Sequence, residues 1–148
     1  PGHVLFLRSE LTEDEAMIFS DNIALARWLQ REIVIRRPEF ADESIPVIPS
    51  TNEKDGDLRS FWTERVSSSE YDISLTWYDL QEPYMVHSEP GEVANRAHGI
   101  YSLFIPARSA QLEVNGMVAA GKPYEREQYG RQGSSAFLAF SETWVRPR

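Results

Sequence analysis

The chain has 148 residues, and its 15 Lys and Arg against 23 Asp and Glu give a formal net charge of −8. This acidic balance argues against nucleic acid or an anionic membrane surface as a partner, because both require a basic face. There is no cysteine, which excludes disulfides, zinc–thiolate sites and thiol nucleophiles. Hydrophobic residues make up 41%, and this length predicts a single domain over 1–148 with a sizeable core.

The first apolar run, Val4–Leu7, predicts a short strand. It is too short for a secretion signal or a membrane span, and no later run approaches that length. We therefore expect a cytoplasmic protein without a membrane partner.

Residues 1–38 are expected to hold this strand and the principal helix. Thr12 and Glu15 have the spacing of a capping box, with Thr12 as the N-cap. A second start signal, Ser20-Asp21-Asn22, precedes an amphipathic helix near residues 21–35. Its apolar face consists of Leu25, Ala26, Leu29 and Ile33. The helix should end before Pro38, which disfavours helical geometry in the residue before it.

Residues 39–57 are expected to form an extended connector, the least regular part of the chain. Pro46 and Pro49 flank Val47-Ile48. Proline cannot donate a hydrogen bond to a neighbouring strand, so this stretch could be an edge strand but not a central one.

Residues 58–148 have the pattern of an antiparallel β region. Asp72–Asp79 alternates apolar and polar residues, as in a half-buried strand. Ile100–Ile105 and Phe137–Phe140 are apolar on both faces and predict strands covered on both sides. A polar loop is expected at Glu89–Arg96. The fold class is therefore α+β and mainly antiparallel β: a curved sheet, a small barrel or a sandwich with one principal N-terminal helix.

Ala110–Ala120 predicts a β-hairpin. Asn115-Gly116 supplies the two positive-φ residues of a two-residue type I′ turn. The register places Val114 opposite Met117 and Leu112 opposite Ala119. The polar stretch that follows, Gly121–Ser134, is expected to be a long loop, and a loop of that length is often functional.

This loop and the sheet beside it give the candidate ligand-binding residues. Arginine supplies a fork of donors for an anion, and an aromatic ring supplies a flat contact. The expected ligand contacts are Tyr124, Arg126, Tyr129 and Arg131 of the loop, and Trp77 of the Asp72–Asp79 strand. An organic acid or an aromatic molecule would suit such a site.

Candidates for acid–base catalysis are His87, His98 and Glu142. Glu142 shares a strand face with Leu138 and Phe140, where burial would raise its pKa or call for a cation such as Arg126. The favoured alternative is that this strand emerges to solvent and leaves Glu142 hydrated. The histidines lack the spacing of a metal site, so neither a metal nor another cofactor is expected.

Three functions remain open. The first is a small-molecule binding domain with an aromatic pocket, which the 4 Trp, 6 Tyr and 7 Phe could line. The second is a cofactor-free acid–base enzyme of the isomerase, lyase or hydrolase type in the same cavity. The third is an interaction protein whose exposed aromatic residues form a homodimer or another interface.

Overall fold

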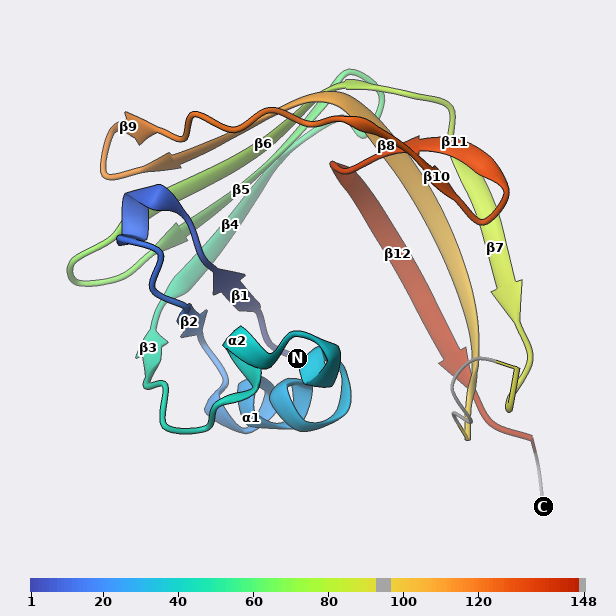
Figure 1. Cartoon of the computed structure of the whole chain (residues 1–148), viewed down its shortest axis with the longest axis horizontal. Coiled ribbons are helices and arrows are strands. Elements are labelled where there is room, and N and C mark those ends of the chain that lie inside the picture. The colour runs from blue at the N-terminus through green and yellow to red at the C-terminus, as the bar shows by residue number, and fades with distance from the viewer. Residues whose placement is uncertain (93–96, 147–148) are drawn as a thin grey trace. The chain divides into compact units, whose positions relative to one another are not determined.

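The computed structural model describes residues 1–92 and 97–146, and most of them lie in strands. The α+β class with mainly antiparallel strands is confirmed. The contacts divide the chain into two compact units (Figure 1). Unit 1 comprises Pro1–Asp55, Thr63–Thr76 and Gln111–Gly121, and unit 2 comprises Gly56–Trp62, Trp77–Ala110 and Lys122–Arg148. That the chain behaves as a single domain stays a prediction.

The N-terminal part of unit 1 contains a small three-stranded sheet, β1-β2-β3. Strand β1 (Val4–Leu7) pairs antiparallel with β2 (Met17–Ser20), and β2 pairs parallel with β3 (Val47–Pro49). Ile18 and Phe19 are neighbours on β2 and point to opposite faces. Their side chains are 0% and 1% exposed, so the sheet is covered on both sides.

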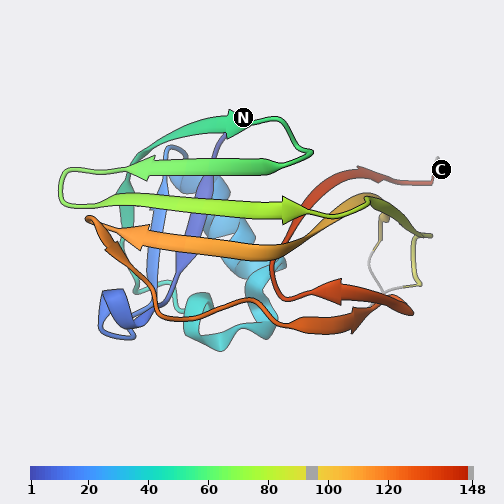
Figure 2. The same cartoon turned by 90° about the horizontal axis from the view of Figure 1, so that it is seen from above.

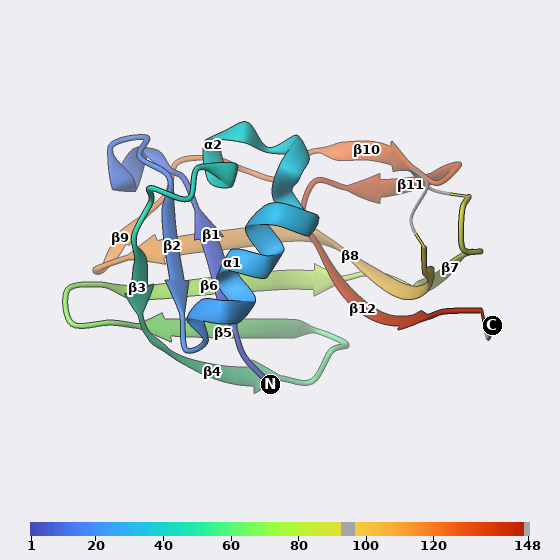
Figure 3. The same ribbon diagram turned by 90° about the horizontal axis from the view of Figure 1, so that it is seen from below.

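One face of this sheet forms the main apolar core. Phe19 and Leu7 pack there with Val66, Ile73 and Val114 of the longer strands. The other face meets helix α1 (Ile23–Glu32), which lies across β1 and β2 in Figures 1 and 3.

Helix α1 follows the predicted start signal. Asn22 is its N-cap, and the Asn22 side chain accepts a hydrogen bond from the backbone N–H of Leu25 at 3.0 Å. The helix is shorter than expected, because a 3₁₀ turn at Val34–Arg36 replaces its last turn. The segment before Pro38 is therefore helical overall, as predicted, but not one continuous α-helix.

The prediction that Thr12 caps a helix is wrong. Ser9 is the N-cap of a short 3₁₀ helix, Glu10–Thr12, and the Thr12 hydroxyl accepts from the backbone N–H of Ser9 at 3.1 Å. Glu13 follows with a φ of 55°. This left-handed residue ends the helix where the predicted one should have begun.

Residues 39–57 are more regular than a connector. They contain most of helix α2 (Pro38–Ala41), all of β3 and strand β4 (Thr51–Gly56). Of the described strands only β2 pairs with β3, so Pro49 stands on an edge strand, as its missing N–H requires.

The larger sheet has the strand order β12-β8-β6-β5-β4, and Figure 2 shows β4, β5, β6 and β8 running side by side. Strand β7 and the short β9 also pair with β8. The bounds are β5 Phe61–Ser67, β6 Asp72–Leu80, β7 Tyr84–Ser88, β8 Gly99–Val114, β9 Met117–Val118 and β12 Phe137–Trp144. The strand predicted at Asp72–Asp79 is thus β6. The loop expected at Glu89–Arg96 lies partly outside the described residues.

The hairpin between β8 and β9 has the predicted register. Val114 pairs with Met117, and the backbone N–H of Ala119 donates to the carbonyl of Leu112 at 2.9 Å. Asn115 and Gly116 have φ of 50° and 81°, as a type I′ turn requires.

Two predictions for unit 2 are wrong. The stretch Gly121–Ser134 is not a long loop but holds a second hairpin, β10 (Glu125–Gln128) and β11 (Arg131–Ser134). Its turn, Tyr129-Gly130, again has two positive φ angles, 52° and 73°. The segment Phe137–Phe140 is covered on both sides only at its start: Leu138 is 8% exposed, but Phe140, on the same face of the strand, is 45% exposed, and Ala139 is exposed on the other face. No helix in the described part of the chain is long and apolar enough to cross a membrane.

Candidate functional site

The hairpin β10–β11 packs on an aromatic face of the β7–β8–β12 sheet. Phe104 of β8 stands at the centre of this face, 9% exposed. The centroid of its ring lies 5.7 Å from that of Tyr84, 5.5 Å from that of Tyr129 and 5.4 Å from that of Phe137. These distances are typical of favourable aromatic pairs. A polar hairpin is therefore held by aromatic contacts rather than by an apolar stripe of its own.

Two arginines of the hairpin lie over the same aromatic face. The guanidinium carbon of Arg131 is 5.1 Å from the centroid of the Tyr84 ring, and that of Arg126 is 5.8 Å from the centroid of Phe137. Both distances suit a cation–π contact. Each arginine thus contributes to the packing of the hairpin on the sheet.

The two arginines differ in their polar partners. With its carboxamide oxygen turned toward Arg126, Gln128 accepts from Nη2 at 2.7 Å and from Nε at 3.2 Å. Arg131 has no carboxylate within ion-pair distance among residues 1–92 and 97–146. Its donors remain available to an anion.

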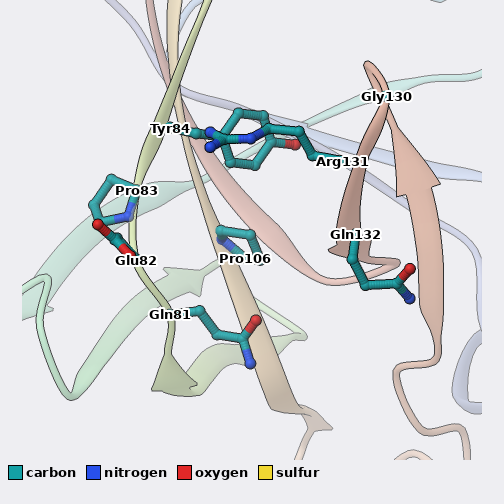
Figure 4. Close-up of a pocket in the computed structure, with 8 residues that line it drawn as sticks. All are labelled: Gln81, Glu82, Pro83, Tyr84, Pro106, Gly130, Arg131 and Gln132. Carbon is teal, nitrogen blue, oxygen red and sulfur yellow. The ribbon is translucent and has the colours of Figure 1, made fainter.

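Arg131 lines a hollow of about 470 Å³ within unit 2 (Figure 4). The lining residues come from the β6–β7 connection, from β8 and from the β10–β11 hairpin: Gln81, Glu82, Pro83, Tyr84, Pro106, Gly130, Arg131 and Gln132. In Figure 4 the side chain of Arg131 crosses the Tyr84 ring, while the amides of Gln81 and Gln132 lie farther along the hollow.

One polar atom of this lining is unsatisfied. Tyr84 is 7% exposed, and its buried hydroxyl has no hydrogen-bond partner among the described residues. A buried polar group without a partner costs free energy, so such groups in folded proteins call for an explanation. A ligand that accepts a hydrogen bond from this hydroxyl would supply such an explanation.

The hollow can hold a small polar molecule. Arg131 offers donors with a positive charge, Gln81 and Gln132 offer both donors and acceptors, and Glu82 adds an exposed acceptor. Pro83 and Pro106 supply apolar surface. This combination suits a carboxylate that also carries a hydroxyl or another donor.

Of the predicted ligand contacts, only Arg131 lines the hollow. Tyr129 packs on Phe104 yet is 67% exposed, Tyr124 is 65% exposed, and Trp77 is half-buried on β6. Arg126 contacts Phe137 instead.

The residues that sequence reasoning missed include Gln81, Tyr84, Gln132 and Pro106. For Tyr84 a signal existed: Tyr84 opens a strand directly after Pro83. The pairing of that strand with β8, which brings Tyr84 beside Phe104, is long-range.

The acid–base candidates do not meet in this hollow. Glu142 is exposed on β12, which agrees with the favoured prediction that the strand emerges to solvent. It lines a second hollow of about 770 Å³ with Met85, Tyr101, Leu103 and residues 139–141. His98 is half-buried just before β8 and lines neither hollow.

His87 belongs to a separate cluster at the end of β7. Its Nε2 lies 3.3 Å from Oε1 of Glu89, whose Oε2 lies 3.5 Å from Nη2 of Arg146. The imidazole stacks on Tyr101 with a centroid separation of 4.4 Å. Glu89 thus connects His87 at the end of β7 to Arg146, which follows β12.

Within the described residues, no three His, Cys, Asp or Glu side chains are placed to hold a metal ion. The chain matches no protein family, no curated protein and no solved structure.

Proposed function

We propose that this chain is a small-molecule binding domain that takes a small organic acid into the hollow beside Arg131. The observation that carries the proposal is a guanidinium that has no carboxylate partner among the described residues. It lies at a hollow whose other polar side chains are two amides, one hydroxyl and one exposed carboxylate. The volume of about 470 Å³ suits a small ligand.

Two further features support an acid as the ligand. A carboxylate accepts two parallel hydrogen bonds from a guanidinium, which gives both affinity and orientation. The Tyr84 hydroxyl is buried and has no partner among the described residues, so it can donate to the same ligand where the side chains that cover it move aside. The acid–base enzyme hypothesis lacks comparable support, since His87, His98 and Glu142 line other parts of the surface.

The test is a titration of isotope-labelled protein, followed by NMR amide shifts. The probes are malate, succinate and benzoate, each compared with its carboxamide, which keeps the shape and removes the charge. We expect a carboxylate to shift the amides of Gly130 and Gln132, and its carboxamide to have little effect.

Two matched variants separate binding from hairpin packing. Arg131→Gln and Arg126→Gln each remove one cation–π contact from the hairpin, so damage to the hairpin would affect both alike. Only Arg131 lines the hollow. Loss of a charged hydrogen bond of about 1.4 kcal/mol or more predicts at least a roughly tenfold weaker affinity for Arg131→Gln.

A third variant tests the hydroxyl. Tyr84→Phe removes a buried group that has no partner, so the free protein should be as stable as the wild type or more stable, while the bound carboxylate is held less tightly. If no probe binds at about 10 mM, or if Arg131→Gln and Arg126→Gln bind alike, the proposal fails.

A further inference from the structure

Strand β12 stands at one end of the larger sheet, and of the described strands only β8 pairs with it. An unpaired strand edge presents a row of N–H and C=O groups that can pair with another strand. The chemistry of this edge can be read from its register.

The register shows which residues of β12 point outward. Ala107 and Ala136 form a hydrogen-bonded pair, since the N–H of Ala107 donates to the carbonyl of Ala136 at 2.9 Å. The next pair along the ladder, Pro106 with Phe137, is not hydrogen-bonded, and Pro106 has no N–H to donate. Hydrogen-bonded and non-hydrogen-bonded pairs alternate in an antiparallel ladder. The backbone groups directed away from β8 are therefore those of residues 137, 139, 141 and 143.

This edge is open. Residues 139–143 are all exposed. The second hollow, of about 770 Å³, reaches from Met85 of β7 to Ala139 and Ser141 of the edge itself. Protein edges are commonly protected by charges, proline or a bulge, and in β12 Glu142 is the single charged residue.

The opposite end of the same sheet is protected in this way. Strand β4 carries Glu53, Lys54 and Asp55 in succession. The edge at β4 therefore bears charges that discourage pairing, whereas the edge at β12 presents Phe140, which is 45% exposed. Of the described strands, β7 also pairs only with β8, but it has five residues against the eight of β12.

We infer that β12 is the interface through which two copies of this chain pair edge to edge, antiparallel and about a two-fold axis at Phe140. In this register residue 137 of one copy pairs with residue 143 of the other, and residue 139 pairs with residue 141. Every outward backbone group of β12 thus takes part in a hydrogen bond between the two copies. Phe140 meets its own counterpart, and Glu142 meets Leu138 rather than a like charge. Such a self-complementary patch is what a two-fold dimer requires.

The net charge of each copy adds a condition. Two chains that each carry −8 repel one another, and added salt screens this repulsion. Pairing should therefore strengthen as salt rises, opposite to an interface held by ion pairs.

The test is sedimentation equilibrium of the full chain at about 10–100 µM in low and high salt, with light scattering as a second measure of mass. We expect a dimer whose dissociation constant falls as salt increases. Ala139→Pro removes an outward N–H, which a proline on an edge strand tolerates, and should give a folded monomer. Phe140→Lys places like charges opposite each other and should have the same effect.

Met85→Lys is the matched control. Met85 is 62% exposed and lines the same hollow, but it lies on β7, which pairs with β8, and not on β12. We expect this variant to remain dimeric. A wild-type monomer in high salt, or a dimer lost in Met85→Lys yet kept in Ala139→Pro, would overturn edge pairing; the second result would show that the apolar face packs instead. Neither outcome depends on ligand binding beside Arg131.

Discussion

Gly56 and Gly116 allow one substitution to be compared in two surroundings. Both have positive φ, 133° and 81°. Gly56 is the last residue of β4, just before the β4–β5 turn, and Gly116 lies within the turn between β8 and β9. A Cβ at Gly116 would meet nothing within 4 Å, whereas a Cβ at Gly56 would lie 2.5 Å from the carbonyl oxygen of Phe61 and 2.8 Å from Cα of Trp62. Replacing each by alanine separates backbone strain from collision.

The expected magnitudes differ clearly. Gly116→Ala costs about 1–2 kcal/mol for a left-handed alanine, of which about 0.4–1 kcal/mol is offset by lower entropy of the unfolded chain. Gly56→Ala adds about 1–3 kcal/mol, because the blocking atoms are backbone and have little room to move. The Phe61 carbonyl also accepts from the N–H of Asp57 at 3.2 Å, so moving it weakens the β4–β5 turn.

Urea denaturation of both variants measures the difference directly. We expect Gly116→Ala to lower the free energy of unfolding by roughly 1 kcal/mol and Gly56→Ala by about 3 kcal/mol. For a chain of this length, each kcal/mol lowers Tm by about 2–4 °C. If the two variants lose equal stability, the close approach of Phe61 and Trp62 to Gly56 is not present in solution.

Three further outcomes are expected. The carboxylate of Glu10 accepts a hydrogen bond from the backbone N–H of Ala120 at 2.6 Å, which lowers the pKa of Glu10. The wild type should therefore be more stable than Glu10→Gln near neutral pH. Thermal melts should show that this difference in stability disappears as pH falls through the lowered pKa. The Gln30 side chain is 1% exposed and donates to the carbonyls of Phe40 and Asp42 at 2.8 and 3.1 Å. Gln30→Leu should lower the free energy of unfolding, measured by urea denaturation, by about 1–3 kcal/mol, because it leaves these carbonyls without a donor. An unchanged midpoint of urea denaturation would contradict this prediction. Elemental analysis should find no stoichiometric transition metal, and about one zinc per chain would refute that prediction.

The hairpin at Ala110–Ala120 could be predicted to the level of its register, because its determinants are local. Asn115-Gly116 selects the turn, and alternation on either side selects the facing residues. The structure places Val114 against Met117 as expected. Val114 also joins the main core, so burial and turn chemistry favour the same register.

The second hairpin had the same kind of turn but was missed. Tyr129-Gly130 adopts two positive φ angles like Asn115-Gly116. The flanking residues are nearly all polar, so no alternation marked them as strands. Their partners are Tyr84, Phe104 and Phe137. The first two are distant in sequence, and all three lie on other strands. Cation–π contacts of this kind have no period that a single sequence displays.

Strand β4 was missed for a related reason. Its residues are polar on both faces, and the prolines nearby suggested a connector. An edge strand needs hydrogen bonds along one side only, and charges on it prevent pairing on the other. Glu53, Lys54 and Asp55 give the stretch no apolar alternation, yet such charges suit a strand at that edge.

The contrast between local and long-range contacts also explains why the candidate site was only partly predictable. Arg131 could be named because arginine in a polar stretch is a general sign of anion binding. That Arg131 and not Arg126 lines the hollow could not be predicted, since both arginines occupy similar sequence positions around one turn. That difference arises because Gln128 takes the donors of Arg126, while Arg131 lies over Tyr84 beside the hollow. Arg131 can hold the hairpin through its flat face and still offer its N–H groups to a ligand, because a cation–π contact leaves the donors at the rim of the guanidinium unused.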